Sequence, residues 1–235
     1  MKKILLCGVL ALSCVISSFA GDVATFVDKG FSEDGKYYIF GQYGKTDKKF
    51  QGWAEIYQVD IEANDYVESG LFKIKPSSVT YNKSGREVFE ALEAKCFYYY
   101  SKIKSETPEI DNVLYILDDV NKTGTDEIVF KDFSGSEIEN PDSYEIRLIP
   151  TINGKGVNAK SSFYIDLKKV DAEGNVIMTQ KIGSPNIVRK GVSNYKIERI
   201  FCDKTKKNMI FIIEKMVEDE TGVSIRYMVE AAKIK

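Results

Sequence analysis

Hydrophobic and polar residues alternate with a period of two through much of the chain, and this pattern predicts β-strands with one buried face. Residues 144–148 and 163–167 alternate aromatic or aliphatic positions with charged or polar ones. The polar stretch 171–175 indicates a turn that leads into a further strand at 176–181. This region alone therefore predicts at least three strands.

The two ends of the chain carry further strand patterns. Near the N-terminus, an Asp34-Gly35 turn precedes an aromatic and β-branched run, which is typical of a hairpin, and residues 53–61 and 66–74 predict the next pair. Near the C-terminus, residues 209–213 are apolar at every position and predict a central strand. Alternate residues of 223–231 form one apolar face.

One segment has the periodicity of a helix. Ser84 and Glu87 fit a capping box, in which the two side chains satisfy free backbone N–H groups at the helix start. An apolar stripe at helical spacing follows and consists of Phe89, Leu92, Cys96, Tyr99 and Ile103. Pro108 closes the segment. We expect this helix to pack against a sheet.

These elements predict a mainly β fold (α+β) with one substantial helix packed on one face. The sheets are antiparallel and form a meander, a sandwich or a propeller-like arrangement, and residues 21–235 form a single β-rich domain. The stretch from Phe31 to Val59 resembles that from Phe201 to Val229, because strand, glycine and Tyr-x-Val follow at matching spacing. This similarity indicates either a repeat or two unrelated hairpins that obey the same rules.

The first twenty residues have the pattern of an export signal. Lys2 and Lys3 precede an uncharged apolar stretch, and the small residues Ser18 and Ala20 fit a cleavage site. We therefore predict a signal peptide at residues 1–20 and a secreted or periplasmic protein without a membrane span in its mature form. A lipid anchor on Cys14 and an uncleaved anchor are the alternatives.

Composition narrows the chemistry that remains. The 235-residue chain contains no histidine, which excludes His-based acid–base catalysis, Ser–His and Cys–His nucleophile pairs, and His-ligated zinc. The formal net charge of −2 becomes more negative when the two lysines of the signal are removed. An acidic protein of this kind is not expected to bind nucleic acid.

Three stretches of the mature chain carry a family resemblance: Gly21–Ala24, Gly30–Tyr37 and Ala54–Tyr57. They resemble a bacterial family of predicted secreted proteins of unknown function, and the likeness extends through the late strands around Asn194 and Ile225. The resemblance implies export and a single domain, and it implies no activity or functional residue. The Phe31–Tyr37 motif alone is similar to blades of periplasmic β-propellers that bind other envelope proteins.

One local motif, Asp119–Glu127, has features of a metal site. Oxygen-bearing side chains occupy positions 1, 3, 5 and 9, and Gly124 occupies position 6, as in calcium loops that precede a strand. However, Thr123 replaces the usual acid, and Phe130 stands where an EF-hand needs a glutamate. A polar turn between two strands is the favoured interpretation, and we assign no metal or cofactor.

Two further groups of residues have alternative interpretations. Cys96 and Cys202 would form either a disulfide or two buried free thiols, and the second is favoured. In the run Phe97–Tyr100, Tyr99 and partly Tyr100 lie on the apolar stripe, whereas Phe97 and Tyr98 do not. This run predicts a helix clamped between a sheet and a loop, or else an exposed aromatic patch. Trp53 is expected in the core.

We therefore expect an exported envelope protein of unknown function that is a non-catalytic binding or structural module, with another envelope protein or a glycan as partner. One alternative is a carboxylate-dependent hydrolase of an envelope polymer, with Asp118-Asp119 or Glu218-Asp219-Glu220 as the acids to consider. The other is a calcium-dependent adhesion or scaffold domain. The lysine-rich stretch Lys204–Lys207 predicts a solubilising turn, and no catalytic, cofactor-binding or metal-binding residue is assigned.

Overall fold

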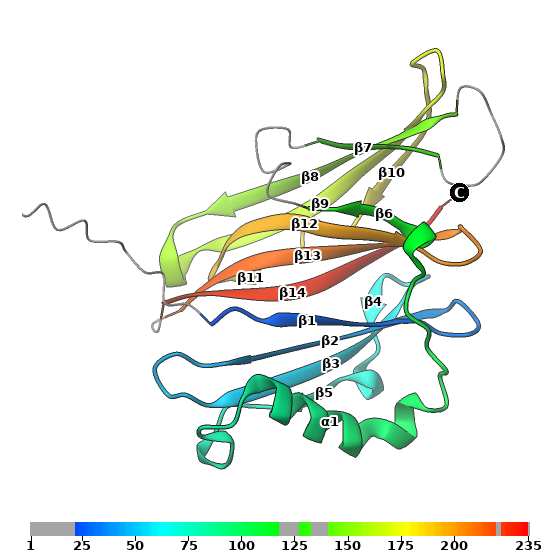
Figure 1. The fold of residues 1–235 in the computed structure, drawn as a ribbon. Helices are drawn as coiled ribbons and strands as arrows, with labels where there is room; N and C mark the ends of the chain where they lie inside the picture. The colour runs from blue at the N-terminus through cyan, green and yellow to red at the C-terminus, as the bar shows by residue number, and fades with distance from the viewer. Residues whose placement is uncertain (1–21, 118–126, 133–140, 220–221, 235) are drawn as a thin grey trace, which may run out of the picture.

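The protein folds into stacked layers of antiparallel sheet with one helix on the outside (Figure 1). This computed structural model describes residues 22–117, 127–132, 141–219 and 222–234. In those residues the fold is mainly β with a single α-helix, which confirms the predicted class. The predicted signal peptide lies outside the described residues.

The first layer, the N-terminal sheet, is built from the first third of the chain. Its strands are β1 (Thr25–Phe31), β2 (Tyr37–Lys45), β3 (Gly52–Asp60), β4 (Asp65–Tyr66) and β5 (Phe72–Ile74). The first three form the predicted hairpins, and β4 and β5 both pair with β3. The single strand expected at 66–74 is interrupted by a 3-10 turn, Glu68–Gly70, which fits closely beside Gln58 because Gly70 has no Cβ.

The second layer, the central sheet, has the order β14-β13-β12-β6. Its strands are β6 (Val113–Ile116), β12 (Val192–Cys202), β13 (Asn208–Asp219) and β14 (Gly222–Lys233). The third layer, the outer sheet, has the order β10-β9-β8-β7, and β11 also pairs with β9. Its strands are β7 (Glu127–Lys131), β8 (Ser143–Asn153), β9 (Lys160–Val170), β10 (Val176–Ile182) and β11 (Arg189–Lys190).

The central sheet is covered on both faces, which explains the uninterrupted apolar run of β13. Ile210 and Ile212 pack against the N-terminal sheet, whereas Met209, Phe211 and Ile213 pack against the outer sheet. All five side chains are fully buried, so the prediction that this strand is central is confirmed. The fold resembles a β-sandwich with a third sheet added. The central sheet lies in the middle, and alternate side chains of β13 point into the two apolar cores on either side of it.

The helix α1 (Gly85–Tyr100) covers the outer face of the N-terminal sheet (Figure 1). It begins with the predicted capping box, in which Ser84 Oγ accepts from Glu87 N and the Glu87 carboxylate accepts from Ser84 N. The predicted stripe faces β2 and β3, although the helix ends at Tyr100, before Ile103. The clamped helix is not observed, because Phe97 and Tyr98 on its outer side are exposed to solvent.

The free edge of β14 is capped by groups from the N-terminal part of the chain. The outward N–H groups of alternate β14 residues each donate to an acceptor there, at 2.6 to 3.1 Å. The four pairs are Ile225 with Asp22 O, Tyr227 with Gln42 Oε1, Val229 with the Tyr66 hydroxyl, and Ala231 with Asn64 Oδ1. The two layers are therefore joined by hydrogen bonds as well as by a shared apolar core.

The two similar stretches occupy equivalent elements in adjacent layers. β1-β2-β3 and β12-β13-β14 are both three-stranded antiparallel meanders. Phe31 ends β1 and Phe201 is the last residue but one of β12, while Gly52 and Gly222 begin the third strands. The sequence similarity therefore corresponds to a similarity of local fold. No helix in the described ranges is long and apolar enough to cross a membrane.

Candidate functional site

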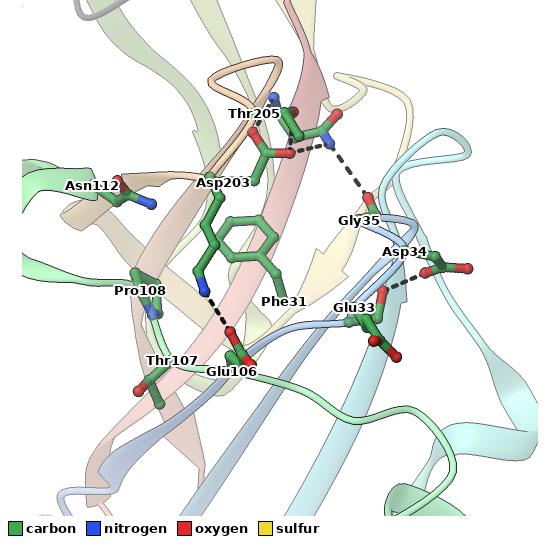
Figure 2. A pocket seen from close by; sticks show the side chains of 13 residues that line it. Phe31, Glu33, Asp34, Gly35, Glu106, Thr107, Pro108, Asn112, Asp203 and Thr205 are labelled. Atoms are coloured by element: carbon green, nitrogen blue, oxygen red, sulfur yellow. Dashed lines mark hydrogen bonds and ion pairs between the residues drawn. The ribbon is translucent and has the colours of Figure 1, made fainter.

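One cleft lies where the turns of the two meanders meet, and it has a volume of about 410 Å³. Figure 2 shows the β1–β2 turn (residues 32–36) facing the β12–β13 turn (residues 203–207), with residues 106–112 forming a third wall. The aromatic ring of Phe31, which is itself largely buried, contributes to the lining. This junction brings together segments that are about 170 residues apart.

Asp203 organises the second turn from a buried position. Its Oδ1 accepts hydrogen bonds from the backbone N–H groups of Lys207 and Asn208, at 2.9 and 3.1 Å. Its Oδ2 accepts from the Thr205 hydroxyl at 2.6 Å and from the Asn208 amide at 2.9 Å. The same amide also donates to the carbonyl oxygen of Gly35 in the other turn, at 3.3 Å. The innermost polar groups of the cleft are thus used to hold the two turns together (Figure 2).

Two of the carboxylates at the rim of the cleft, Glu106 and Asp34, favour their ionised form. The Lys204 ammonium pairs with Glu106 at 2.5 Å and lowers the pKa of that carboxyl. The Ser32 hydroxyl donates to Asp34 at 2.7 Å and likewise lowers the pKa of Asp34. The general acid of a glycosidase needs a raised pKa so that it holds a proton at neutral pH. Neither carboxyl is suited to that role. Lys204, which was expected in a solubilising turn, forms an ion pair from the β12–β13 turn.

The outer face of α1 is a candidate of a different kind. Phe97 and Tyr98 are 71% and 74% exposed, as expected from their positions off the stripe, and the neighbouring Ala91 and Ala94 are exposed as well. Lys102 places its ammonium 4.1 Å from the centroid of the Tyr98 ring. These residues form a small apolar surface on a rigid element, which we call the α1 outer face (Ala91, Ala94, Phe97 and Tyr98).

The other two aromatic residues of the run hold the helix to the sheet. The Tyr99 hydroxyl donates to Gln58 Oε1 at 2.8 Å, and the Tyr100 hydroxyl donates to the carbonyl oxygen of Gly70, also at 2.8 Å. Both therefore lie on the sheet side of α1, and Tyr100 is buried. Trp53 is buried in the core, as predicted.

Cys96 and Cys202, the two cysteines among the described residues, are free and buried, which confirms the favoured prediction. Cys96 lies on the stripe of α1, where its thiol donates to the carbonyl oxygen of Leu92, and Cys202 ends β12. Burial raises the pKa of Cys96 and raises that of Cys202 to about 11. The thiolate is the reactive form of cysteine, and a raised pKa disfavours it. These two side chains are therefore suited to packing in the core and not to nucleophilic chemistry.

Most of the predicted calcium motif lies outside the described residues. Only Glu127 is described, and Arg147 donates to its carboxylate at 2.8 Å. Within the described ranges, no group of three or more Cys, Asp or Glu side chains is arranged to hold a metal ion. Of the predicted acidic runs, Asp118-Asp119 and Glu220 also lie outside, whereas Glu218 and Asp219 end β13.

A partly buried polar cluster around Asp28 and Tyr38 lies between the N-terminal and central sheets, and it was not predicted from the sequence. Asp28 accepts a hydrogen bond from the Tyr38 hydroxyl at 2.9 Å, and burial raises the pKa of both groups. Arg199 lies near this pair and also contacts Glu198 at 3.2 Å; burial raises the pKa of Glu198 too. Strand alternation places Asp28 on the same side of β1 as Phe26, which packs against the core. This alternation is the feature of the sequence that could have indicated an inward-facing Asp28.

Comparison with protein families gives one match. The family model described as "Predicted secreted protein (DUF2259)" matches residues 39–233, which is most of the chain. No curated protein matches.

Proposed function

This chain belongs to the family of predicted secreted proteins that matches it, and we propose that it is a non-catalytic binding module of the cell envelope or periplasm. The α1 outer face is its docking surface, and another envelope protein is its partner. The observation that carries the proposal is the exposure of two adjacent aromatic rings, Phe97 and Tyr98, on a helix whose opposite face is core.

Exposed aromatic rings are the residues that contribute most to protein interfaces. Each buries about 150–250 Å² when it is covered, and Tyr adds a hydrogen-bonding hydroxyl at the rim. The helix is fixed by the buried stripe and by the Tyr99 and Tyr100 hydrogen bonds, so little entropy is lost when a partner binds. A preformed helical face of this kind suits a protein groove.

The charges around the α1 outer face indicate what the partner surface contains. Lys95 and Lys102 flank the aromatic pair, and neither forms an ion pair within the described residues. A partner with an apolar patch rimmed by carboxylates complements this arrangement. The absence of histidine from the sequence and the lowered pKa values of Asp34 and Glu106 in the turn cleft favour a role in contact over a role in hydrolysis.

Site-specific photo-crosslinking in cells tests the proposal. A photoreactive residue is placed at position 98 and, as a control, at position 177, since Ile177 is an exposed apolar residue on the outer sheet. We expect a specific crosslinked protein from position 98 that is absent from position 177 and is lost in a Phe97→Ser variant. Equal products from both positions, no protein product, or a product that contains only glycan would each contradict the proposal.

A further inference from the structure

The end of the molecule opposite the turn cleft carries an exposed apolar group. The β2–β3 turn (residues 46–51) lies beside the segment that leads into α1, because Asn82 N donates to the carbonyl oxygen of Phe50 at 2.9 Å and Gln51 pairs with Tyr81. Phe50, Val79 and Tyr81 are 54%, 75% and 57% exposed. Two segments that are separate in sequence therefore present three large apolar side chains at one tip.

Phe50 is held outward by a backbone conformation that is uncommon for a bulky residue. Its φ is 49°, in the left-handed region, and its N–H donates to the carbonyl oxygen of Thr46 at 2.9 Å. Such strain persists only where the surrounding structure imposes it, and it is often found at functional sites. Here the strained turn exposes an aromatic ring to solvent.

The same tip is rich in unpaired lysines. We define the basic tip as the three apolar residues together with Lys45, Lys48, Lys49, Lys75 and Lys83. None of these five lysines forms an ion pair within the described residues; Lys45 lies 5.7 Å from the Phe50 ring centroid. The acidic groups nearby are Asp22, Asp47, Glu87 and Asp219; Asp22 is paired with Arg226, and the Glu87 carboxylate is engaged in capping α1. The tip is therefore positive on a chain whose net charge is negative.

A cleft of about 390 Å³ opens beside the turn. Lys48, Lys49, Lys75 and Arg226 contribute its positive charges, and Arg226 is itself paired with Asp22 at 2.7 Å. The three lysines leave their ammonium groups available to an anion. A phosphate group is of suitable size and charge for such a cleft.

We propose that the basic tip docks on an anionic membrane surface, with the apolar side chains entering the interface and the lysines contacting lipid phosphates. Lysines interspersed with exposed aromatic and aliphatic residues are the usual composition of interfacial membrane contacts. Charge complementarity supports this occupant. The tip carries lysines without ion pairs among the described residues on a chain of negative net charge, and the phosphates of anionic lipids carry the opposite charge.

Vesicle flotation with the exported form of the protein, purified from cells, tests the proposal. Binding is compared between vesicles of phosphatidylcholine alone and vesicles that contain roughly one-third phosphatidylglycerol. The difference between the two isolates the charge-dependent contact from any lipid anchor, which binds both. We expect the native protein to prefer the anionic vesicles and to lose this preference in about 0.5 M salt, where exposed charges are screened.

The informative variant combines Lys48→Glu with Lys49→Glu, and we expect it to lower binding to the anionic vesicles at least tenfold. The matched control combines Lys206→Glu with Lys207→Glu, which makes the same charge change in the turn at the opposite end of the sheets. A melting curve for each variant checks that the fold is kept. Unchanged binding in the tip variant, equal losses in both variants, or no preference of the native protein for anionic vesicles would overturn the proposal. A Phe97→Ser variant leaves vesicle binding unchanged, so this test is separate from that of the α1 outer face.

Discussion

Trp53 donates a hydrogen bond of 2.6 Å from its indole nitrogen to Oδ2 of Asp22, and the guanidinium of Arg226 bonds the same oxygen at 2.7 Å. The guanidinium also lies 4.2 Å from the Trp53 ring centroid. One largely buried carboxylate thus connects the start of the described chain to β3 and to β14.

Replacing Arg226 by Met removes the cation from this group and leaves a buried carboxylate with a single donor. We expect a loss of about 2 kcal/mol in the free energy of unfolding, because a buried charge without its partner is costly. Urea denaturation measures the loss. Arg147→Met is the control, since its ion pair with Glu127 is largely exposed and is expected to contribute much less. Equal losses would contradict the assigned role of Asp22.

The cap on the β14 edge predicts a specific effect for Gln42. Its Oε1 accepts from Tyr227 N at 2.9 Å, so Gln42→Leu leaves a buried N–H without a partner and should cost about 2 kcal/mol in denaturation experiments. Gln180→Leu is the matched control, because Gln180 Oε1 is buried without a hydrogen bond. We expect that variant to be neutral or more stable, and a larger loss for Gln180→Leu would argue against the edge interpretation.

The raised pKa of Asp28 predicts how stability changes with pH. The folded protein keeps this proton at a pH where the unfolded chain, with the ordinary value of 3.8, has released it. Unfolding then releases a proton, so the contribution of Asp28 to stability falls as pH rises above that value. Asp28→Asn should weaken this decline in denaturation curves measured from about pH 4 to pH 7. If the stability of the variant falls with pH as steeply as that of the native protein, the burial of Asp28 is not the cause of the decline.

We expect a substitution at Gly30 to destabilise the fold, because of both its backbone conformation and the atoms that lie next to it. Its φ is 85°, and a Cβ there would lie 1.8 Å from the carbonyl oxygen of Glu106, which accepts from Phe31 N. Gly174 has a similar φ of 89° and open space around it. In melting experiments, Gly174→Ala should cost about 1 kcal/mol from backbone strain, and Gly30→Ala about 3 kcal/mol or more. If the two variants lose similar amounts of stability, the backbone at residue 106 can move away from the new Cβ without destabilising the fold.

The two buried thiols predict a simple labelling result. In the native protein an alkylating reagent should leave Cys96 and Cys202 unmodified, because both are buried and have raised pKa values. In denaturant without reductant, both should react. Mass spectrometry of the peptides that contain them reads the outcome, and failure of both to react in denaturant would indicate a disulfide.

Local sequence patterns predicted the helix α1 and most of the strands, because the formation of each of these elements depends mainly on residues close together in the sequence. The capping box of Ser84 and Glu87 and the doubly apolar run of β13 are examples. The stacking of layers was not predictable in this way. β6 and β12 are neighbours in the central sheet, yet the whole outer sheet lies between them in sequence, and periodicity contains no information on such pairing.

Of the two candidate surfaces, the one set by local helical geometry was predicted from the sequence, and the one formed by separate segments was not. Phe97 and Tyr98 were identified as lying off the stripe, because helical geometry decides this directly. The basic tip was not predicted, since Phe50 and Tyr81 become neighbours only through contacts between separate segments. Gln42 was missed because a polar residue on the inward face of β2 has no visible partner until β14 is placed beside it.

The joining of β14 to the beginning of the chain has a consequence for export. Arg226 and Asp22 are 204 residues apart, and Tyr227 and Gln42 are 185 apart, so these contacts form only after nearly the whole chain is available. Contacts of such long range close slowly, since loop-closure entropy must be lost first. The central sheet is therefore completed only when its last strand, β14, is available, and this order suits a polypeptide that crosses a membrane before it folds.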